Sequence, residues 1–288
     1  MSTGQPIAWL DGRWGDPGSL CLPLNDRGLL LADGLFETVL IASGRPRLLA
    51  DHLQRWQHSA AQLGMAAPPS QAWLDPLIAE AIERSGLAGG MGGLGAVQRR
   101  LRGALRLNWS RGGSGRGLDL PEPAGGERFW LQLTPWQPSF APLRAIVSRW
   151  ERRDAASSLS RCKTFAYGSS VQARREAQLA GADDALLPSS TGGLCCGTAA
   201  NLLVQRQGTW LTPPLSSGCL PGVMRNRALH LGLAQEAPLD LDQLQHSQGV
   251  LLLNSLGCRP VWHLEGQPLA QQLAPATAAR FWCRLLQA

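Results

Sequence analysis

A proline-bearing segment near the middle of the chain, residues 135–142 (PWQPSFAP), is the feature that most restricts the possible folds. Proline has no backbone N–H and disrupts both helix interiors and central strands, so regular structure is interrupted here. The 288 residues are enough for two domains of roughly 100 to 200 residues each. We therefore expect a small N-terminal α/β domain over residues 1–134, a linker over 135–142 and a larger C-terminal domain over 143–288.

The hydrophobic pattern predicts both strands and helices on either side of this linker. Residues 7–49 alternate short apolar runs with turn signals, which is typical of a small antiparallel sheet. Apolar residues recur every three to four positions over residues 51–63 and 70–87, which predicts two helices, and residues 105–109 and 129–134 are expected to be strands. In the second half we expect strands at 145–150, 185–187 and 250–254, helices at 170–180, after Pro221-Gly222 and at 271–286, and a hairpin at 201–212 turning at Gln207-Gly208. The glycine-crowded residues 86–95 are expected to form a loop. The predicted fold class is α/β.

Composition excludes several classes of protein. Hydrophobic residues make up 44% and charged residues 17% of the chain, which excludes a largely disordered protein. Apolar runs stay shorter than the roughly 18 residues of a membrane helix, and the first residues do not form a targeting signal, so we expect a cytoplasmic protein that does not bind membranes. The seven cysteines include no CxxC pair and the five histidines are scattered, so we expect neither a disulfide framework nor a metal site.

The net charge of +6 and the arginine-glycine segment at residues 111–117 are compatible with nucleic-acid binding. However, the basic residues are spread along the chain, without basic runs or regularly spaced aromatic residues. The charge suits an enzyme for small anionic molecules equally well, and we expect no nucleic-acid partner.

Lysine is the most informative residue type. The chain contains one lysine, Lys163, and the other 26 of its 27 basic residues are arginine. Arginine serves for surface charge, but its guanidinium does not lose its proton in proteins, so it cannot replace lysine where a free amine must react. Lys163 is therefore a candidate catalytic amine, although a single surface lysine left by chance is the alternative. The only tyrosine, Tyr167, lies four residues later.

Eight segments in this order resemble those of the fold-type IV pyridoxal-phosphate enzymes. This class IV aminotransferase family includes branched-chain and D-amino-acid aminotransferases and aminodeoxychorismate lyases. The segments are Asp26-Arg-Gly, Asp33-Gly-Leu-Phe-Glu-Thr38, His52-Leu-Gln-Arg55, Lys163-Thr-Phe-Ala-Tyr167, Glu176-Ala-Gln-Leu-Ala-Gly-Ala-Asp-Asp184, Asn201-Leu-Leu, Thr212-Pro-Pro and Leu220-Pro-Gly-Val-Met-Arg225. The resemblance covers nearly the whole chain. It implies a two-domain fold like that of D-amino-acid aminotransferases, pyridoxal 5'-phosphate bound in the C-terminal domain, and a homodimer whose active site lies between the domains.

The resemblance also implies roles for individual residues. Lys163 would hold the cofactor as a Schiff base and act as catalytic base, and Tyr167 would lie beside the cofactor ring, unless it is a core tyrosine. The helix that begins at Val223 and Met224 would bind the phosphate through its free N–H groups, with Arg55 as a charged partner unless that arginine is merely solvated.

Three further sites are predicted with less support from the motifs. Ser255 would add a phosphate contact after the strand at 250–254. Thr38 would hydrogen-bond the substrate, or be a strand threonine without a role. Arg116, and less so Arg111, lie in the glycine-rich loop that borders the substrate side in relatives, and either would hold a substrate carboxylate.

One position departs from the family pattern. Relatives carry a glutamate, which pairs with the pyridine nitrogen of the cofactor, where this chain has Cys196. A thiol is a poor charge partner for the pyridine nitrogen, so this position argues against ordinary transamination. The lyase reaction depends on that partner less, because formation of an aromatic product drives it. The segment Leu253-Asn-Ser-Leu-Gly-Cys-Arg-Pro-Val261 also resembles the lyases. We therefore expect an aminodeoxychorismate lyase that makes 4-aminobenzoate for folate biosynthesis, with an aminotransferase or a catalytically weak family member as alternatives.

Overall fold

The computed structural model describes residues 4–87, 102–113, 117–121 and 126–287. The chain divides into two compact units. Unit 1 consists of Met1–Gln137 together with Lys163–Phe165, and unit 2 consists of Pro138–Cys162 and Ala166–Ala288. The three residues Lys163–Phe165 thus belong to unit 1, although the segments on both sides of them belong to unit 2.

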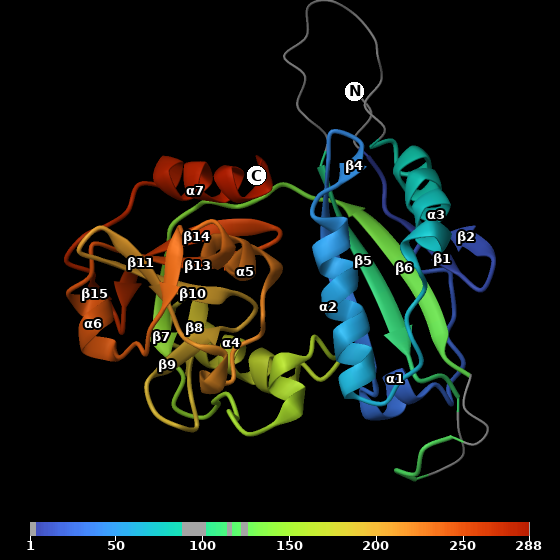
Figure 1. Ribbon diagram of the computed structural model, residues 1–288, viewed down its shortest axis with the longest axis horizontal. Helices are drawn as coiled ribbons and strands as arrows, with labels where there is room; N and C mark the ends of the chain where they lie inside the picture. The colour runs from blue at the N-terminus through green and yellow to red at the C-terminus, as the bar shows by residue number, and fades with distance from the viewer. Residues whose placement is uncertain (1–3, 88–101, 114–116, 122–125, 288) are drawn as a thin grey trace, which may run out of the picture. The chain divides into compact units, whose positions relative to one another are not determined.

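Unit 1 is built on an antiparallel six-stranded sheet in the order β2-β1-β6-β5-β3-β4 (Figure 1). The longest pairing joins β3 to β5 over nine residues of each strand, and β5 pairs in turn with β6. The strands are β1 (Ile7–Leu10), β2 (Arg13–Gly15), β3 (Gly34–Ala42), β4 (Arg45–Pro46), β5 (Arg102–Ser110) and β6 (Arg128–Pro135). The antiparallel sheet predicted from residues 7–49 is confirmed, and it is completed by the two strands predicted at 105–109 and 129–134.

The described residues of unit 1 include the helices α1 (Arg27–Leu31), α2 (Leu49–Gln62) and α3 (Gln71–Arg84). Helix α2 packs on β3, and α3 contacts β1. Successive side chains of a strand point to opposite faces, and Glu37 of β3 bonds to side chains of α2, so the odd-numbered residues of β3 face this helix. Even-numbered residues such as Phe36 and Thr38 consequently face the other side of the sheet.

Unit 2 contains a mixed sheet in the order β12-β11-β10-β13-β14-β7-β8-β9. Strand β9 also pairs with β10, through Cys196 and Asn201, so the strands from β10 to β9 close into a ring. The strands are β7 (Leu143–Val147), β8 (Asp184–Pro188), β9 (Leu194–Gly197), β10 (Asn201–Arg206), β11 (Thr209–Thr212), β12 (Ala234–Glu236), β13 (Gly249–Asn254), β14 (Gly257–Leu264) and β15 (Gln267–Pro268), the last pairing with β14.

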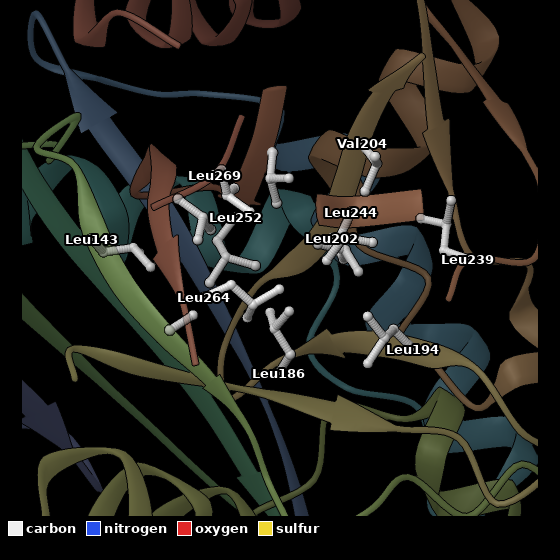
Figure 2. Packing of buried hydrophobic residues seen from close by; sticks show 13 residues of the cluster. Leu143, Leu186, Leu194, Leu202, Val204, Leu239, Leu244, Leu252, Leu264 and Leu269 are labelled. Atoms are coloured by element: carbon white, nitrogen blue, oxygen red, sulfur yellow. The ribbon is translucent and has the colours of Figure 1, made fainter. Parts of the chain in front are cut away.

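Branched aliphatic side chains from these strands form the main core of unit 2. Figure 2 shows leucines of β8, β10, β13 and β14 pointing toward one another, with Leu239 and Leu244 from the chain around α6. The helices of this unit are α4 (Gly168–Leu179), α5 (Val223–His230), α6 (Leu241–Gln245) and α7 (Pro275–Gln287), with short 3-10 turns at Ser158–Arg161 and Leu215–Ser217.

Most predicted elements are found close to their expected bounds, and the α/β fold class is confirmed. The predicted hairpin is β10–β11, and its turn residues Gln207 and Gly208 both have positive φ. Helix α5 begins at Val223 directly after Gly222, as predicted. The largest differences are at element ends: β5 begins at Arg102 rather than near residue 105, α3 ends at Arg84 rather than 87, β7 stops at Val147 rather than 150, and α7 begins at Pro275 rather than near residue 271. Of the loop expected over residues 86–95, the part from 88 onward lies outside the described residues.

Candidate active site

The backbone of Lys163 is held by the first residues of β3, away from Ile41 and Ala42, where β4 pairs. The amide of Phe36 donates to the carbonyl of Lys163 at 2.9 Å, the amide of Phe165 donates to Gly34 at 2.9 Å, and Thr164 bridges Leu35 between them. A Cβ added to Gly34 would lie 2.2 Å from Cε2 of Phe165. Glycine at position 34 is therefore what allows the lysine segment to approach the strand so closely.

The side chain of Lys163 shares an aromatic ring with an arginine. Its Nζ lies 4.3 Å from the centroid of the Phe36 ring, and Cζ of Arg106 lies 3.5 Å from the same centroid. Arg106 is on β5 directly opposite Thr38, and its Nε donates to Asn108 Oδ1 at 2.7 Å. The Lys163 amine, the Arg106 guanidinium and Thr38 therefore lie on the face of the sheet that carries the even-numbered residues of β3. Cation–π attraction favours both positive charges over the Phe36 ring.

Arg55 lies on the opposite side of β3, against Glu37. Arg55 donates from Nε to Glu37 Oε1 at 2.8 Å and from Nη2 to Oε2 at 2.5 Å, and His52 Nδ1 lies 2.7 Å from Oε2. Burial favours the neutral acid, but the charge of Arg55 and the bond to His52 outweigh it and hold the pKa of Glu37 at about 2. Burial lowers the pKa of His52 against the pull of Glu37. Sequence reasoning quoted both Glu37 and His52 within motifs but gave neither a role.

The two loop arginines predicted to hold a substrate carboxylate are placed differently. Arg116 lies outside the described residues. Arg111 is buried, and its Nε donates to Asp33 Oδ2 at 2.9 Å while Nη1 and Nη2 donate to the carbonyls of Gly64 and Leu63, each at 2.9 Å. These bonds join Arg111 to the C-terminal end of α2. Its predicted contact with substrate stays a prediction.

In unit 2, the start of α5 has the form of an anion cradle. Its N-cap, Gly222, provides no side-chain hydrogen bond, so the first N–H groups of the helix, at Val223 and Met224, receive no cap from it. A Cβ on Gly222 would lie 1.9 Å from Oδ1 of Asn201, whose Nδ2 donates to the Leu220 carbonyl at 2.9 Å. The carboxamide of Asn201 thus fixes the turn that leads into the helix and requires glycine there.

Tyr167 and Ser255 also belong to unit 2. Tyr167 is the N-cap of α4 and borders a cavity of about 470 Å³ along that helix, which Arg174 and Thr198 also line. Ser255 lies in the turn between β13 and β14, where Asn254 donates to the Ala199 carbonyl at 3.2 Å and accepts from the amide of Leu256 at 2.8 Å. The turn that carries Ser255 is thereby joined to the loop at residues 198–200.

Cys196 lies on β9 within a group of three buried thiols. Hydrogen bonds from Cys195 to Cys196 and Cys219, together with burial, raise the pKa of Cys195. The bond with Cys195 has the opposite effect on Cys219, and with the nearby charge of Arg225 it lowers the pKa of that thiol to about 7, although burial opposes this. The rest of the cluster is apolar: Ile146, Ala173, Ala177, Ala185 and Leu187. The position expected to face the pyridine nitrogen is thus surrounded by thiols and aliphatic groups.

The predicted site residues fall into two groups by unit. Lys163, Thr38, Arg55 and Arg111 belong to unit 1, and Tyr167, Cys196, Val223, Met224 and Ser255 belong to unit 2. Within the described residues, the acidic, histidine and cysteine side chains form no group that could hold a metal ion. Among the helices that the structure describes, none has the length and apolar character needed to cross a membrane.

Arg106 is the residue of this site that sequence reasoning missed. The signal was present, because Arg106 and Asn108 alternate with Leu105 and Leu107 along a predicted strand, which places both polar side chains on one face.

Comparison with known proteins identifies the family. The family model described as amino-transferase class IV matches residues 34–264. A putative branched-chain-amino-acid aminotransferase of Methanocaldococcus jannaschii is 25% identical over 267 residues, covering 90% of this chain and 88% of the relative. A putative aminodeoxychorismate lyase of Schizosaccharomyces pombe is 29% identical over 227 residues, covering 77% of this chain and 85% of the relative.

Among solved structures, a hypothetical aminotransferase from Mycobacterium tuberculosis in its PLP-bound form superposes with a TM-score of 0.80 at 22% identity, covering 98% of this chain and 99% of the other. Agreement over nearly the full length confirms the predicted fold, that of the fold-type IV transaminases. The match of the family model over most of the chain shows that this protein belongs to the class IV aminotransferase family.

Proposed function

We propose that this chain is an aminodeoxychorismate lyase, which releases pyruvate from 4-amino-4-deoxychorismate and leaves 4-aminobenzoate, a precursor for folate biosynthesis. The observation that carries the proposal is the buried Cys196 thiol, packed among other thiols and aliphatic side chains at the position where the family resemblance leads us to expect a glutamate. A thiol among aliphatic groups gives little support to a protonated pyridine nitrogen, on which transamination depends. A reaction driven by formation of an aromatic product depends on it less. The fission yeast relative carries the same lyase name.

The cofactor is pyridoxal phosphate, and two features of the chain fit it. Lys163 is the only lysine available to bind the aldehyde. At the start of α5, the absence of a side-chain cap at Gly222 fits a phosphate oxygen, which the N–H groups of Val223 and Met224 would bind. Arg55 supplies positive charge for the same phosphate, Ser255 a hydroxyl, and Tyr167 a contact to the ring.

Bound pyridoxal phosphate supplies an aldehyde that condenses with amines and a conjugated ring that accepts electron density. The work of Lys163 is to move protons. The free amine of Lys163 would remove the proton from the ring carbon that carries the substrate amine. The carbon–oxygen bond at the neighbouring ring carbon then breaks, and enolpyruvate leaves. Lys163 returns a proton to its methylene carbon, which gives pyruvate.

Arg106 is proposed to bind a carboxylate of the substrate. Aminodeoxychorismate carries two carboxylates, and a guanidinium can bind one through two parallel hydrogen bonds. Phe36 supports both Arg106 and the Lys163 amine, so a carboxylate bound at Arg106 would be held at a fixed distance from the base. Thr38, directly opposite Arg106, is the nearby hydroxyl that would complete this contact.

The second candidate function is an aminotransferase for branched-chain or D-amino acids. It is favoured by the Methanocaldococcus jannaschii relative, which matches a larger share of the chain than the lyase relative does. An aminotransferase would form a 2-oxo acid from an amino acid in the presence of 2-oxoglutarate, whereas a dedicated lyase would do so poorly. A homodimer and a cytoplasmic location remain expectations from the family resemblance and the sequence.

The test measures 4-aminobenzoate released from aminodeoxychorismate generated in situ. The wild type should form product, and both Lys163→Ala and Lys163→Arg should form none, because arginine keeps the charge but cannot act as a free amine. Arg161→Ala, which removes an exposed charge two residues away, is the control and should retain activity. Borohydride trapping and peptide mapping should place the cofactor on the peptide that contains Lys163. A wild type that binds cofactor but transaminates amino acids and releases no 4-aminobenzoate would refute the lyase.

A further inference from the structure

Glu37, His52 and Arg55 form a buried unit that the proposed reaction does not itself use, called here the Glu37 cluster. The side chains of Glu37 and His52 are each 1% exposed, and that of Arg55 is 10% exposed. Glu37 lies in the middle of β3, whereas His52 and Arg55 are three residues apart and so lie on one face of α2. Both oxygens of the carboxylate are occupied by donors from this helix.

The hydrogen bonds determine the charges within the cluster. The carboxylate of Glu37 is ionised and can only accept, so the proton of the neutral His52 ring lies on Nδ1 and is donated to Oε2. The cluster therefore contains one carboxylate, one guanidinium and a neutral imidazole. The charges that bear on His52 are those of Glu37 on β3, Arg55 on its own helix, and Lys163 beside β3; the two cations both disfavour a charged ring.

The geometry fixes Arg55 rather than merely neutralising it. A bidentate arginine–carboxylate pair defines the plane of the guanidinium, and the third bond, from His52, holds the carboxylate in that orientation. An unrestrained arginine side chain loses rotamer entropy when it binds a ligand. An arginine already held by its own protein avoids much of that loss.

We infer that Glu37 and His52 are positioning residues that hold Arg55 in place for the phosphate of pyridoxal phosphate. The inference rests on the proposed contact between Arg55 and that phosphate. It predicts a change in phosphate affinity for Glu37→Gln that is opposite to the change expected from charge alone. Glu37→Gln removes a negative charge close to the phosphate partner, so Coulomb attraction alone would tighten phosphate binding. Loss of positioning would weaken it, since the amide of glutamine brings its own donors against the donors of Arg55 and His52.

The experiment compares dissociation constants for pyridoxal phosphate and for pyridoxal, which lacks the phosphate, by absorbance titration of the full chain. Glu37→Gln should weaken binding of pyridoxal phosphate roughly 10- to 100-fold, as loss of a supporting hydrogen bond does at other preorganised sites, and change pyridoxal binding by less than about 3-fold. Glu80→Gln, which removes a carboxylate from an exposed arginine pair on α3, is the matched control and should leave both constants unchanged.

Arg55→Ala and the double variant Glu37→Gln with Arg55→Ala distinguish the positioning role of Glu37 from the proposed contact between Arg55 and the phosphate. Arg55→Ala should strongly lower the preference for the phosphorylated ligand, and adding Glu37→Gln to it should have no further effect, because both changes act through the same guanidinium. If Arg55→Ala lowers the preference but Glu37→Gln leaves or strengthens it, the positioning role is refuted and the phosphate contact stands. If Arg55→Ala leaves the preference intact, the phosphate contact itself is refuted.

A second pair of variants covers the case in which Glu37→Gln does not fold. His52→Leu removes the donor that orients the carboxylate, and His52→Asn returns an N–H donor near the place of Nδ1. His52→Leu should lower the preference for pyridoxal phosphate several-fold, and His52→Asn should largely restore it. Equal losses of pyridoxal and pyridoxal phosphate binding in His52→Leu, without recovery in His52→Asn, would indicate a purely structural role and overturn the inference.

Discussion

Replacing Gly34 with alanine tests how the lysine segment is attached to β3. The added methyl group would lie 2.2 Å from Cε2, 2.6 Å from Cδ2 and 2.9 Å from Cζ of Phe165, so either the ring or the strand must move. The Phe165 ring cannot turn away freely, because it packs between Phe36 and Trp130 with centroid distances of 6.3 and 5.6 Å. Overpacking of this kind costs about 1–3 kcal/mol.

The substitution should also displace Lys163, because the hydrogen bonds from Phe165 N to Gly34 O and from Phe36 N to Lys163 O hold the lysine segment on β3. Gly34→Ala should therefore lower the unfolding free energy by about 1–3 kcal/mol and reduce lyase activity by at least about tenfold. Urea unfolding followed by tryptophan fluorescence measures the first effect, with Trp130 as a local reporter. Gly168→Ala is the matched control, since its added methyl meets no atom within 4 Å.

Removing the Phe165 ring tests whether its clash with the added methyl group causes the loss of stability in Gly34→Ala. In Gly34→Ala with Phe165→Ala, the clash is absent, so the double variant should be more stable than the sum of the two single losses predicts, by about 1 kcal/mol or more. An additive result, or a Gly34→Ala variant as stable and active as the wild type, would show that Phe165 does not pack against Gly34 and would refute this account of the lysine position.

Four further outcomes are expected. The pKa of Glu37 is lowered from 4.5 to about 2, so it contributes up to about 3 kcal/mol of stability above pH 4.5 that is lost as the pH falls toward 2; urea unfolding should show a steeper loss in the wild type than in Glu37→Gln. Asp184→Asn should cost about 2–3 kcal/mol in the same assay, because the buried carboxylate accepts from Thr198 at 2.6 Å and pairs with Arg174 at 2.8 Å. Arg106→Gln should raise KM for aminodeoxychorismate at least about tenfold with a smaller change in kcat; the reverse split would argue against a carboxylate contact. Thiol titration should find two fast-reacting cysteines in the native protein, the exposed Cys21 and Cys283, and all seven after denaturation.

Local patterns were sufficient to predict most elements of this fold. Helix α2 was visible in the spacing of apolar residues, and α5 in the proline-glycine step before it, because both signals depend on residues within one or two turns of each other. The predicted start of α7 is too early, because Leu273 and Ala274 continue the apolar spacing without being helical. Closure of the strand ring through Cys196 and Asn201 was not predicted, since pairing between strands is decided by the tertiary structure.

Composition and motifs located the candidate site better than they described it. The single lysine singled out Lys163, but its attachment to β3 joins residues more than a hundred positions apart, and no local pattern encodes such a pairing. His52 and Arg55 were visible at helical spacing, yet nothing in the sequence states that the carboxylate between them comes from Glu37. The sequence therefore indicates candidate reactive groups, and the structure shows their partners.

The segment from Gly34 to Glu37 explains why these residues must stand in this order. Gly34 admits Phe165, Phe36 lies under the Lys163 amine, and Glu37 faces α2 and holds Arg55. Because side chains alternate along a strand, a slip of one residue would turn Phe36 toward α2 and bring the carboxylate to the lysine side. A carboxylate there would pair with the amine and favour its protonated form, while Arg55 would lose its partner. The same alternation thus keeps the carboxylate away from the proposed base and supplies it to the proposed phosphate ligand.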